Sequence, residues 1–255
     1  MTEHPSRALA YVRDNAAAAG LVLDFDGVLS PMVDEPAESR LMAGNAELLA
    51  RLRVRLRALA VVSGRPTEFL RDRVPVPGVH VVGSYGLEDD PETESWLPMV
   101  RWATTELERI FAGGEGVWVE RKAVTVAAHW RTAADRAHAQ ARAQAAVERL
   151  AAETGLWVVP GKLVLELRPP LAVDKGTTLA RLVAGHGLQA VVYVGDDEGD
   201  APAMRQAVVA GGHALLVDHG AETPSGLREL ASEVFPGVEG FQVWLGALAE
   251  QLDRP

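Results

Sequence analysis

Cysteine is absent from the 255 residues of this sequence. Disulfide bonds, thiolate metal sites and cysteine nucleophiles are therefore excluded, and the composition fits a protein of the reducing cytoplasm. Long apolar runs are missing as well, since none approaches the roughly 20 residues that span a bilayer. The stretch 1–15 carries scattered charges and lacks the apolar core of a signal peptide. We therefore expect a cytoplasmic protein without a membrane partner.

Positive charge is in short supply, with 25 lysine and arginine residues against 35 aspartate and glutamate residues, for a formal net charge of -10. An acidic surface repels nucleic acid and anionic membranes, so neither is expected as a partner. A protein of this charge that binds an anionic ligand has to gather its cations inside the binding site. The composition leaves the oligomeric state open.

Short apolar runs that end in polar or glycine residues predict buried β-strands. Helical stretches follow several of these runs, and such alternation indicates a parallel sheet with helices on both faces, a Rossmann-like α/β fold. The polar loops at the carboxyl ends of the strands then converge on one site. The five predicted strands are 21–23, 58–62, 79–82, 190–194 and 214–217.

The middle of the chain has a different pattern, with two helices and two stretches of alternating apolar and polar residues. Alternation predicts an antiparallel sheet that has one face covered by helices and one face open. We therefore predict an inserted α+β domain at 88–170, between the two parts of the core domain at 1–87 and 171–255. Its predicted helices are 97–111 and 132–153, and its predicted hairpins are 117–131, turning near Arg121 and Lys122, and 156–168, turning at Pro160 and Gly161.

Two carboxylates, Asp24 and Asp26, follow the first predicted strand. In an extended chain they point the same way and repel each other, and a divalent cation would relieve this repulsion. One carboxylate could then attack phosphorus while the other moves protons. The pair alone fits an acidic turn closed by Gly27 equally well.

Three other parts of the sequence add polar groups. Ser63 ends the second strand and could hold phosphate oxygens together with the backbone N–H groups that follow it. Lys175 could stabilise charge on a carboxylate and a phosphoryl group together. Carboxylates follow the fourth strand, and such hard oxygen ligands suit Mg²⁺. These carboxylates are Asp196, Asp197 and Asp200.

Taken together, these motifs resemble those of the haloacid dehalogenase (HAD)-like phosphatases. The segments that carry the resemblance are DFDGVLSP at 24–31, VVSGR at 61–65, Lys175, and VGDDEGD at 194–200. Within that superfamily the chain is similar to the trehalose-6-phosphate phosphatases over roughly residues 20–245. This closer similarity lies in GSYGLE at 83–88, HWR at 129–131, GK at 161–162, ELRP at 166–169 and DKG at 174–176.

The resemblance implies a Mg²⁺-dependent phosphatase that acts on a small sugar phosphate through an aspartyl-phosphate. Asp24 would be the nucleophile and Asp26 the general acid and base, with its main-chain carbonyl on the metal. Ser63 and Lys175 would bind the phosphoryl group, and Asp196 would ligate Mg²⁺. Asp197 and Asp200 would lie close to the ion.

The resemblance also implies that the open face of the inserted sheet closes over the sugar. From the pattern alone, that face would simply be wetted by solvent. The residues that the resemblance assigns to substrate binding are Gly27, Gly64, Arg65, Glu88, His129, Arg131, Lys162, Glu166 and Arg168.

Three departures from the family pattern leave the identity of the sugar open. One is the stretch EGDAP at 198–202, where the family more commonly has a threonine- and acid-rich sequence. Val28 stands where the family usually has threonine, and Tyr85 stands where many members have histidine. The phosphate ester of another disaccharide or pseudodisaccharide is therefore an alternative substrate. A catalytically silent sugar-phosphate binding protein is a second alternative, but such a relative could lose any of four residues that are all present here. These are Asp24, Asp26, Lys175 and Asp196.

Overall fold

The computed structural model describes residues 6–33, 36–114, 116–161 and 163–254. The chain divides into two compact units by its internal contacts. The core unit consists of Met1–Gly86 and Val173–Pro255, and the inserted unit consists of Leu87–Ala172. In the part of the chain that the structure describes, no helix combines the length and the apolar character that crossing a bilayer requires.

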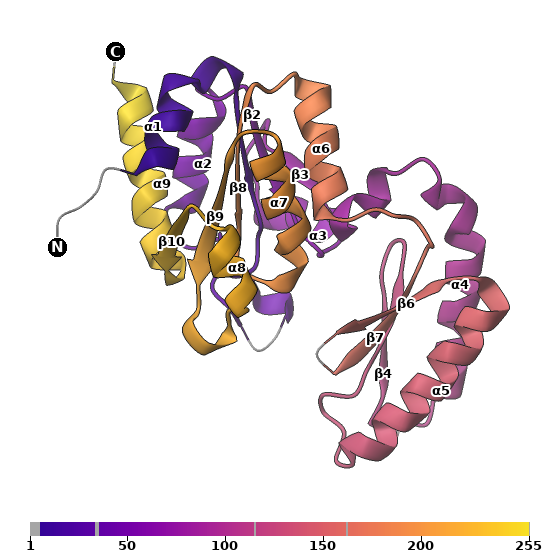
Figure 1. Ribbon diagram of the computed structural model, residues 1–255. Helices are drawn as coiled ribbons and strands as arrows, with labels where there is room; N and C mark the ends of the chain where they lie inside the picture. Colours follow the sequence, from indigo (N-terminus) through magenta and orange to yellow (C-terminus); the bar gives the residue numbers. More distant parts are fainter. Residues whose placement is uncertain (1–5, 34–35, 115, 162, 255) are drawn as a thin grey trace. The chain divides into compact units, whose positions relative to one another are not determined.

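The core unit contains a six-stranded parallel sheet in the order β10-β9-β8-β1-β2-β3 (Figure 1). The central strand β1 is buried along its whole length, because helices cover both faces of the sheet. All five strands predicted for the core are present. The strands are β1 (Ala19–Leu23), β2 (Ala58–Val62), β3 (His80–Val82), β8 (Ala190–Gly195), β9 (His213–Asp218) and β10 (Glu233–Pro236).

The strand β10 was not among the predicted strands. Its four residues, Glu233–Pro236, are only partly buried or exposed. It lies at the edge of the sheet, where it pairs with β9, and an edge strand is where proline is tolerated. A short, half-exposed edge strand lacks the continuous apolar run that marks the buried strands.

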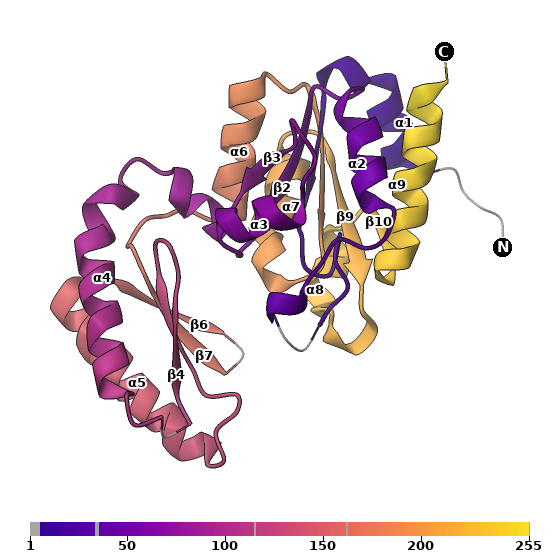
Figure 2. The same cartoon turned by 180° about the vertical axis from the view of Figure 1, so that it is seen from behind.

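Helices cover both faces of the parallel sheet, as Figures 1 and 2 show. One apolar cluster joins Leu21 and Leu23 to the first group of helices, and a second cluster joins Val22 to the other group. Successive residues of β1 thus enter opposite cores. The first group is α1 (Arg7–Asp14), α2 (Asn45–Arg53), α3 (Thr67–Arg73) and α9 (Gly237–Asp253), and the second is α6 (Lys175–His186), α7 (Ala201–Val209) and α8 (Ser225–Leu230).

The inserted unit has a four-stranded antiparallel sheet in the order β4-β5-β7-β6. Two helices cover one face of it, so the side chains of Val126, Ala128 and Leu167 are buried in an apolar core, while the alternate residues occupy the other face. The elements are α4 (Thr93–Ile110), β4 (Trp118–Arg121), β5 (Val126–His129), α5 (Arg136–Thr154), β6 (Trp157–Gly161) and β7 (Val164–Arg168).

The predicted position of the second turn in this unit is wrong. Pro160 and Gly161 belong to β6, where they pair with Leu165 and Val164. The proline fits because β6 is an edge strand, and the positive φ of 63° at Leu163 shows that the chain reverses later. A proline–glycine pair favours a turn locally, but strand pairing decides otherwise here.

Helix boundaries also differ from the predicted ones. The helix predicted from 132 begins at Arg136, because Asp135 caps it by accepting a hydrogen bond from the backbone N–H of His138 at 3.0 Å. The helix predicted at 97–111 begins earlier, at Thr93.

Candidate active site

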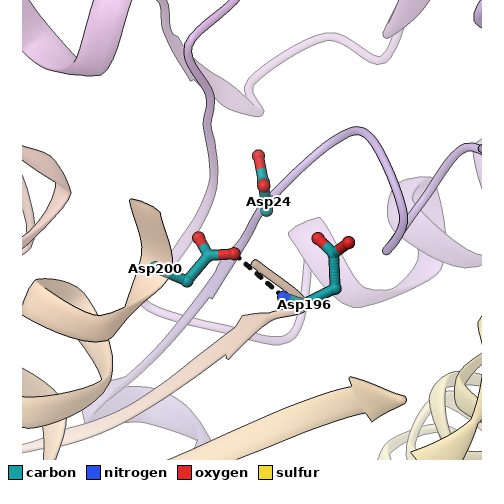
Figure 3. Close-up of side chains that lie close together, drawn as sticks. All are labelled: Asp24, Asp196 and Asp200. Carbon is teal, nitrogen blue, oxygen red and sulfur yellow. Dashed lines mark hydrogen bonds between the residues drawn. The ribbon is translucent and has the colours of Figure 1, made fainter. Parts of the chain in front are cut away.

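Three neighbouring strands of the core unit deliver the polar groups of the candidate site. Asp24 follows β1, Ser63 follows β2, and Asp196 follows β8. The order β8-β1-β2 makes these strands adjacent, so their carboxyl ends lie side by side. All three residues are buried, and Asp24, Asp196 and Asp200 each offer an oxygen within 4.8 Å of the others (Figure 3).

The ammonium group of Lys175 joins two of these carboxylates. Its Nζ donates to Asp24 Oδ2 and to Asp200 Oδ1, each at 2.7 Å, although the residue is only 2% exposed. Lys175 is the first residue of α6, and a capping box between Asp174 and Thr177 fixes that end of the helix. The first residue of α6 therefore places its ammonium group in the protein interior, where it pairs with Asp24 and Asp200.

Asp200 organises the loop after β8. Its Oδ1 also accepts a hydrogen bond from the hydroxyl of Tyr193 at 2.5 Å, and its Oδ2 accepts the backbone N–H groups of Asp196 and Asp197 at 2.9 and 3.1 Å. Figure 3 shows the bond to the amide of Asp196. Asp200 therefore fixes the loop, in addition to contributing to the acidic cluster.

Negative charge exceeds positive charge in this cluster. Burial raises the pKa of Asp24 well above its ordinary value, although Lys175 opposes the shift. Burial, followed by repulsion from Asp24 and Asp200, raises the pKa of Asp196 to about 9. A divalent cation among these oxygens would favour the ionised carboxylates, so the donor set fits a hard cation such as Mg²⁺.

The pKa of Asp200 moves the other way. Burial acts to raise it, but the charge of Lys175 and the hydrogen bonds from Lys175, Tyr193 and the loop amides outweigh burial and lower it. Burial likewise acts to lower the pKa of Lys175, but attraction to Asp200 and Asp24 raises it well above its ordinary value. The structure therefore holds a charged ammonium between carboxylates.

Asp26 has a separate environment from Asp24. Arg65 donates to it twice, from Nε to Oδ2 at 2.6 Å and from Nη2 to Oδ1 at 3.0 Å, and Ser39 Oγ donates to Oδ1 at 2.6 Å. The expectation of an extended chain through both aspartates fails, because β1 ends at Leu23 and the backbone then turns. Arg65, predicted to bind substrate, is thus paired with Asp26.

Gly27 fills a position that only glycine fits. Its φ is +72°, and an added Cβ would lie 2.1 Å from Asp196 Oδ2. Its carbonyl oxygen is 2.8 Å from His219 Nε2, and that nitrogen is also 3.7 Å from Asp196 Oδ2. Gly27 therefore allows the segment 24–31 to pack closely against the loop that carries Asp196. His219, which sequence reasoning missed, contacts both Gly27 and Asp196.

The loops after β2 and β3 support each other. The backbone N–H of Arg65 donates to Ser63 Oγ at 3.3 Å, and the N–H of Tyr85 donates to the carbonyl of Ser63 at 2.9 Å. A Cβ at Gly64 would lie 2.5 Å from the hydroxyl oxygen of Tyr85. Tyr85 and Ser84 have positive φ values of 60° and 49°, so this loop is locally strained.

The inserted unit presents a second group of polar residues on the sheet face away from its helices. Glu166 Oε1 accepts from Lys122 Nζ at 2.9 Å and from Thr125 Oγ1 at 2.5 Å. His129 Nε2 lies 2.9 Å from Glu120 Oε2. The ring of Trp118 stacks on His129 with centroids 4.0 Å apart and an interplanar angle of 6°. We call Trp118, Glu120, Lys122, Thr125, His129 and Glu166 the polar face.

The predicted site residues thus fall into separate groups. Asp24, Asp196 and Asp200 share the acidic cluster of the core unit, whereas the side chains of Asp26 and Asp197 do not belong to it. His129 and Glu166 share the polar face of the inserted unit. The structure also places Glu88 in a short helical turn, Arg131 just after β5 and Arg168 at the end of β7, and Lys162 lies outside the described residues.

Sequence reasoning missed three members of the polar face. They are Trp118, Glu120 and Lys122. The alternation of residues in β4 could have identified two of them. Trp118 pairs with His129 and Glu120 pairs with Ala127 in the antiparallel ladder, so Trp118 and Glu120 lie on the same face as His129.

Comparison with known proteins decides the family. A family model described as trehalose-phosphatase matches residues 22–220. The chain belongs to the trehalose-phosphatase family.

Curated members of this family cover most of the chain. A trehalose-phosphate phosphatase of Mycobacterium avium is 36% identical in an alignment 234 residues long that covers 84% of this chain and 59% of that protein. A trehalose-phosphate phosphatase of Mycobacterium tuberculosis is 34% identical in an alignment 204 residues long that covers 74% of this chain and 51% of that protein. The chain therefore spans between half and three fifths of the length of these relatives.

Solved structures share the fold of the family. A trehalose-6-phosphate phosphatase related protein has a TM-score of 0.73 at 23% identity, covering 91% of this chain and 97% of that one. The C-terminal domain of the trehalose-6-phosphate phosphatase of C. albicans has a TM-score of 0.71 at 19% identity, covering 95% and 96%. A HAD-like hydrolase from Bacteroides thetaiotaomicron has a TM-score of 0.60 at 15% identity, covering 90% and 99%. The architecture is a HAD-like Rossmann core with an α+β cap domain, as the sequence predicted.

The buried lysine leads to a stability prediction. Lys175→Met leaves Asp24 and Asp200 buried without their cation, so we expect the free energy of unfolding in metal-free buffer to fall by ~3–5 kcal/mol. Urea unfolding followed by circular dichroism measures this change. Arg109→Met is the control, because Arg109 pairs with Glu106 on the exposed surface of α4, and it should unfold close to the wild type. A Lys175→Met variant within about 1 kcal/mol of the wild type would contradict the assigned ion pair.

Proposed function

We propose that this protein hydrolyses trehalose 6-phosphate to trehalose and phosphate in the presence of Mg²⁺. The observation that carries the proposal is the buried carboxylate of Asp24 bonded to Lys175 at 2.7 Å, beside Asp196 and Asp200. Membership of the trehalose-phosphatase family supports this choice of ester, as do relatives that carry the name trehalose-phosphate phosphatase. The acidic cluster explains how such an ester would be cleaved.

Asp24 is the nucleophile in this proposal. Its Oδ2 accepts from Lys175, and its Oδ1 accepts from the backbone N–H of Phe25 at 2.6 Å, so the carboxylate is held in one orientation. One of its oxygens attacks phosphorus while the bond between phosphorus and the sugar oxygen breaks. Lys175 remains charged and offsets the negative charge that builds up on the phosphoryl group.

Asp26 moves the protons. It gives a proton to the departing sugar oxygen and then accepts one from the water that attacks the phosphorus of the aspartyl-phosphate. The second step releases inorganic phosphate and restores Asp24. The separate environments of the two aspartates support separate roles, since Asp24 pairs with Lys175 and Asp26 pairs with Arg65.

Asp24 and Asp196 would hold the Mg²⁺ ion through carboxylate oxygens and Asp26 through its main-chain carbonyl. Asp197 and Asp200 would lie close by, since both oxygens of Asp200 already accept from Lys175, Tyr193 and two loop amides. When bound, the ion supplies positive charge that offsets repulsion between the ester and the carboxylates. Asp196 is suited to this role, because burial beside two other carboxylates makes its ionised form costly without a cation.

The polar face of the inserted unit is proposed to recognise the sugar. Its carboxylates and its imidazole can accept hydrogen bonds from sugar hydroxyls or donate to them. Hydrogen bonds within the face, such as the one from Lys122 to Glu166, already hold these groups in place. Preordered polar groups lose less entropy when they bind. The predicted roles of Arg131, Arg168, Lys162 and Glu88 in sugar binding are part of the same proposal.

A substrate panel tests the function and the metal together. The wild-type chain should release phosphate fastest from trehalose 6-phosphate, compared with other disaccharide and monosaccharide phosphates, and only with Mg²⁺ present. Excess chelator should abolish release, and added Mg²⁺ should restore it. Asp196→Asn should require a higher Mg²⁺ concentration for half-maximal activity. Full activity in chelator would refute the metal assignment, and a faster reaction with another sugar phosphate would refute the choice of trehalose 6-phosphate.

The nucleophile is tested by Asp24→Asn. The amide keeps the shape of the side chain but cannot form the aspartyl-phosphate, so we expect turnover to fall by at least about 10⁴-fold. Circular dichroism should show an intact fold. Asp26→Asn should lose ~10²–10⁴-fold, the usual contribution of proton transfer. Asp24→Asn turnover within about tenfold of the wild type would show that the reaction does not pass through Asp24.

The sugar assignment is tested on two esters. His129→Ala and Glu166→Ala should each lower kcat/KM for trehalose 6-phosphate by ~10-fold, because each removes a polar partner of the sugar. Hydrolysis of p-nitrophenyl phosphate, which has no sugar, should hardly change. Arg121→Ala is the matched control, since Arg121 pairs with Glu108 of α4, and it should leave both esters unaffected. Equal losses on both esters would count against sugar recognition by the polar face.

A further inference from the structure

A chain of hydrogen bonds leads through two buried serines to Asp26. Ser30 and Ser39 are both 0% exposed, and their Oγ atoms are 2.7 Å apart. Ser39 Oγ is 2.6 Å from Asp26 Oδ1, and the backbone N–H of Arg40 donates to Ser30 Oγ at 3.1 Å. Neither serine is used in the proposed steps of catalysis.

Counting protons fixes the direction of this chain. Oδ1 of Asp26 also accepts from Arg65 Nη2 and has no hydrogen to donate, so Ser39 donates its single hydroxyl hydrogen to that oxygen. Ser30 must then donate to Ser39, because this 2.7 Å bond is shorter than its other contact, 3.2 Å to the carbonyl of Pro31. The amide of Arg40 completes the chain by donating to Ser30.

The two oxygens of Asp26 are not equivalent as a result. Among the residues that the structure describes, Oδ1 accepts from both Ser39 and Arg65 Nη2, whereas Oδ2 accepts from Arg65 Nε alone. Since a carboxylate oxygen has about two acceptor positions, Oδ1 is fully used and Oδ2 keeps one free. Oδ2 is therefore the oxygen that can exchange a proton with a substrate.

The backbone of Ser39 is anchored from two sides. Its carbonyl accepts from Arg73 Nε at 3.1 Å and from Arg40 Nη1 at 2.9 Å. The guanidinium groups of Arg65 and Arg73 both lie over the ring of Phe69, at 5.1 and 4.7 Å from its centroid. Ser39 is thus a fixed donor, whereas Arg65 reaches Asp26 on a long side chain.

We propose that Ser39 is a positioning residue that orients Asp26 so that Oδ2, and not Oδ1, exchanges the proton during catalysis. The proposal rests on the proposed acid and base role of Asp26. Without the hydroxyl, Oδ1 regains an acceptor position and the carboxyl group loses its fixed support. The proton can then reside on an oxygen that does not serve the departing group.

The test compares esters that differ in their need for a proton. Phenyl phosphate and p-nitrophenyl phosphate have similar shapes, but p-nitrophenolate departs as a stabilised anion, whereas phenolate and a sugar oxygen need protonation more. The quantity to measure is kcat/KM, which reports the steps up to and including departure of the leaving group. For Ser39→Ala we expect a loss of about 10-fold on the sugar phosphate that the wild type cleaves fastest, about 5-fold on phenyl phosphate, and under about 2-fold on p-nitrophenyl phosphate.

Two further variants complete the experiment. Ser39→Thr retains the hydroxyl and should keep the wild-type ratio between the esters. Thr104→Ala removes a buried hydroxyl from α4, where it bonds to the carbonyl of Val100, and should also leave the ratio unchanged. Equal losses of Ser39→Ala on all esters, an unchanged ratio, or failure of this variant to fold would overturn the proposal. Turnover of the sugar phosphate by the wild type tests the proposed function separately.

Discussion

The buried ammonium of Lys175 is the group on which the arrangement of the core unit's site depends. It lies 2.7 Å from a carboxylate oxygen of Asp24 and 2.7 Å from one of Asp200. Burial disfavours each of these charges alone, and only their mutual attraction and hydrogen bonds compensate. Asp24 follows β1, Asp200 precedes α7 and Lys175 is the first residue of α6, so one set of ion pairs joins three segments that are far apart in the sequence. The same set leaves Asp196 with excess negative charge beside it, which favours a cation.

The contrast between Asp24 and Asp26 shows how environment separates two chemically identical side chains. Asp24 is buried with a lysine and other carboxylates, whereas Asp26 is half-buried and bonded to Arg65 and Ser39. Such a division of environments is how paired carboxylates acquire different tasks. It arises because the strand ends at Leu23, after which the backbone turns and the two side chains meet different loops.

The buried strands were predictable because each is a continuous apolar run covered on both faces. β2 occupies the residues that its pattern indicates, Ala58–Val62. β10 was missed because an edge strand needs no such run and is defined by its pairing with β9. The turn at Pro160 was misplaced for a related reason, since the pairing of β6 with β7 overrides the local preference of proline and glycine.

The sequence by itself determined which residues follow the strands, and parallel topology then brings Asp24, Ser63 and Asp196 together at one edge. It also determined the alternation that puts His129 and Glu166 on one face of the inserted sheet. Only the tertiary structure decided which groups the site residues bond to. Ser39 and Arg65 donate hydrogen bonds to Asp26, and His219 contacts the carbonyl oxygen of Gly27. The physical reason is that burial patterns are local properties of the chain, whereas a hydrogen bond between loops far apart in sequence depends on how those loops pack.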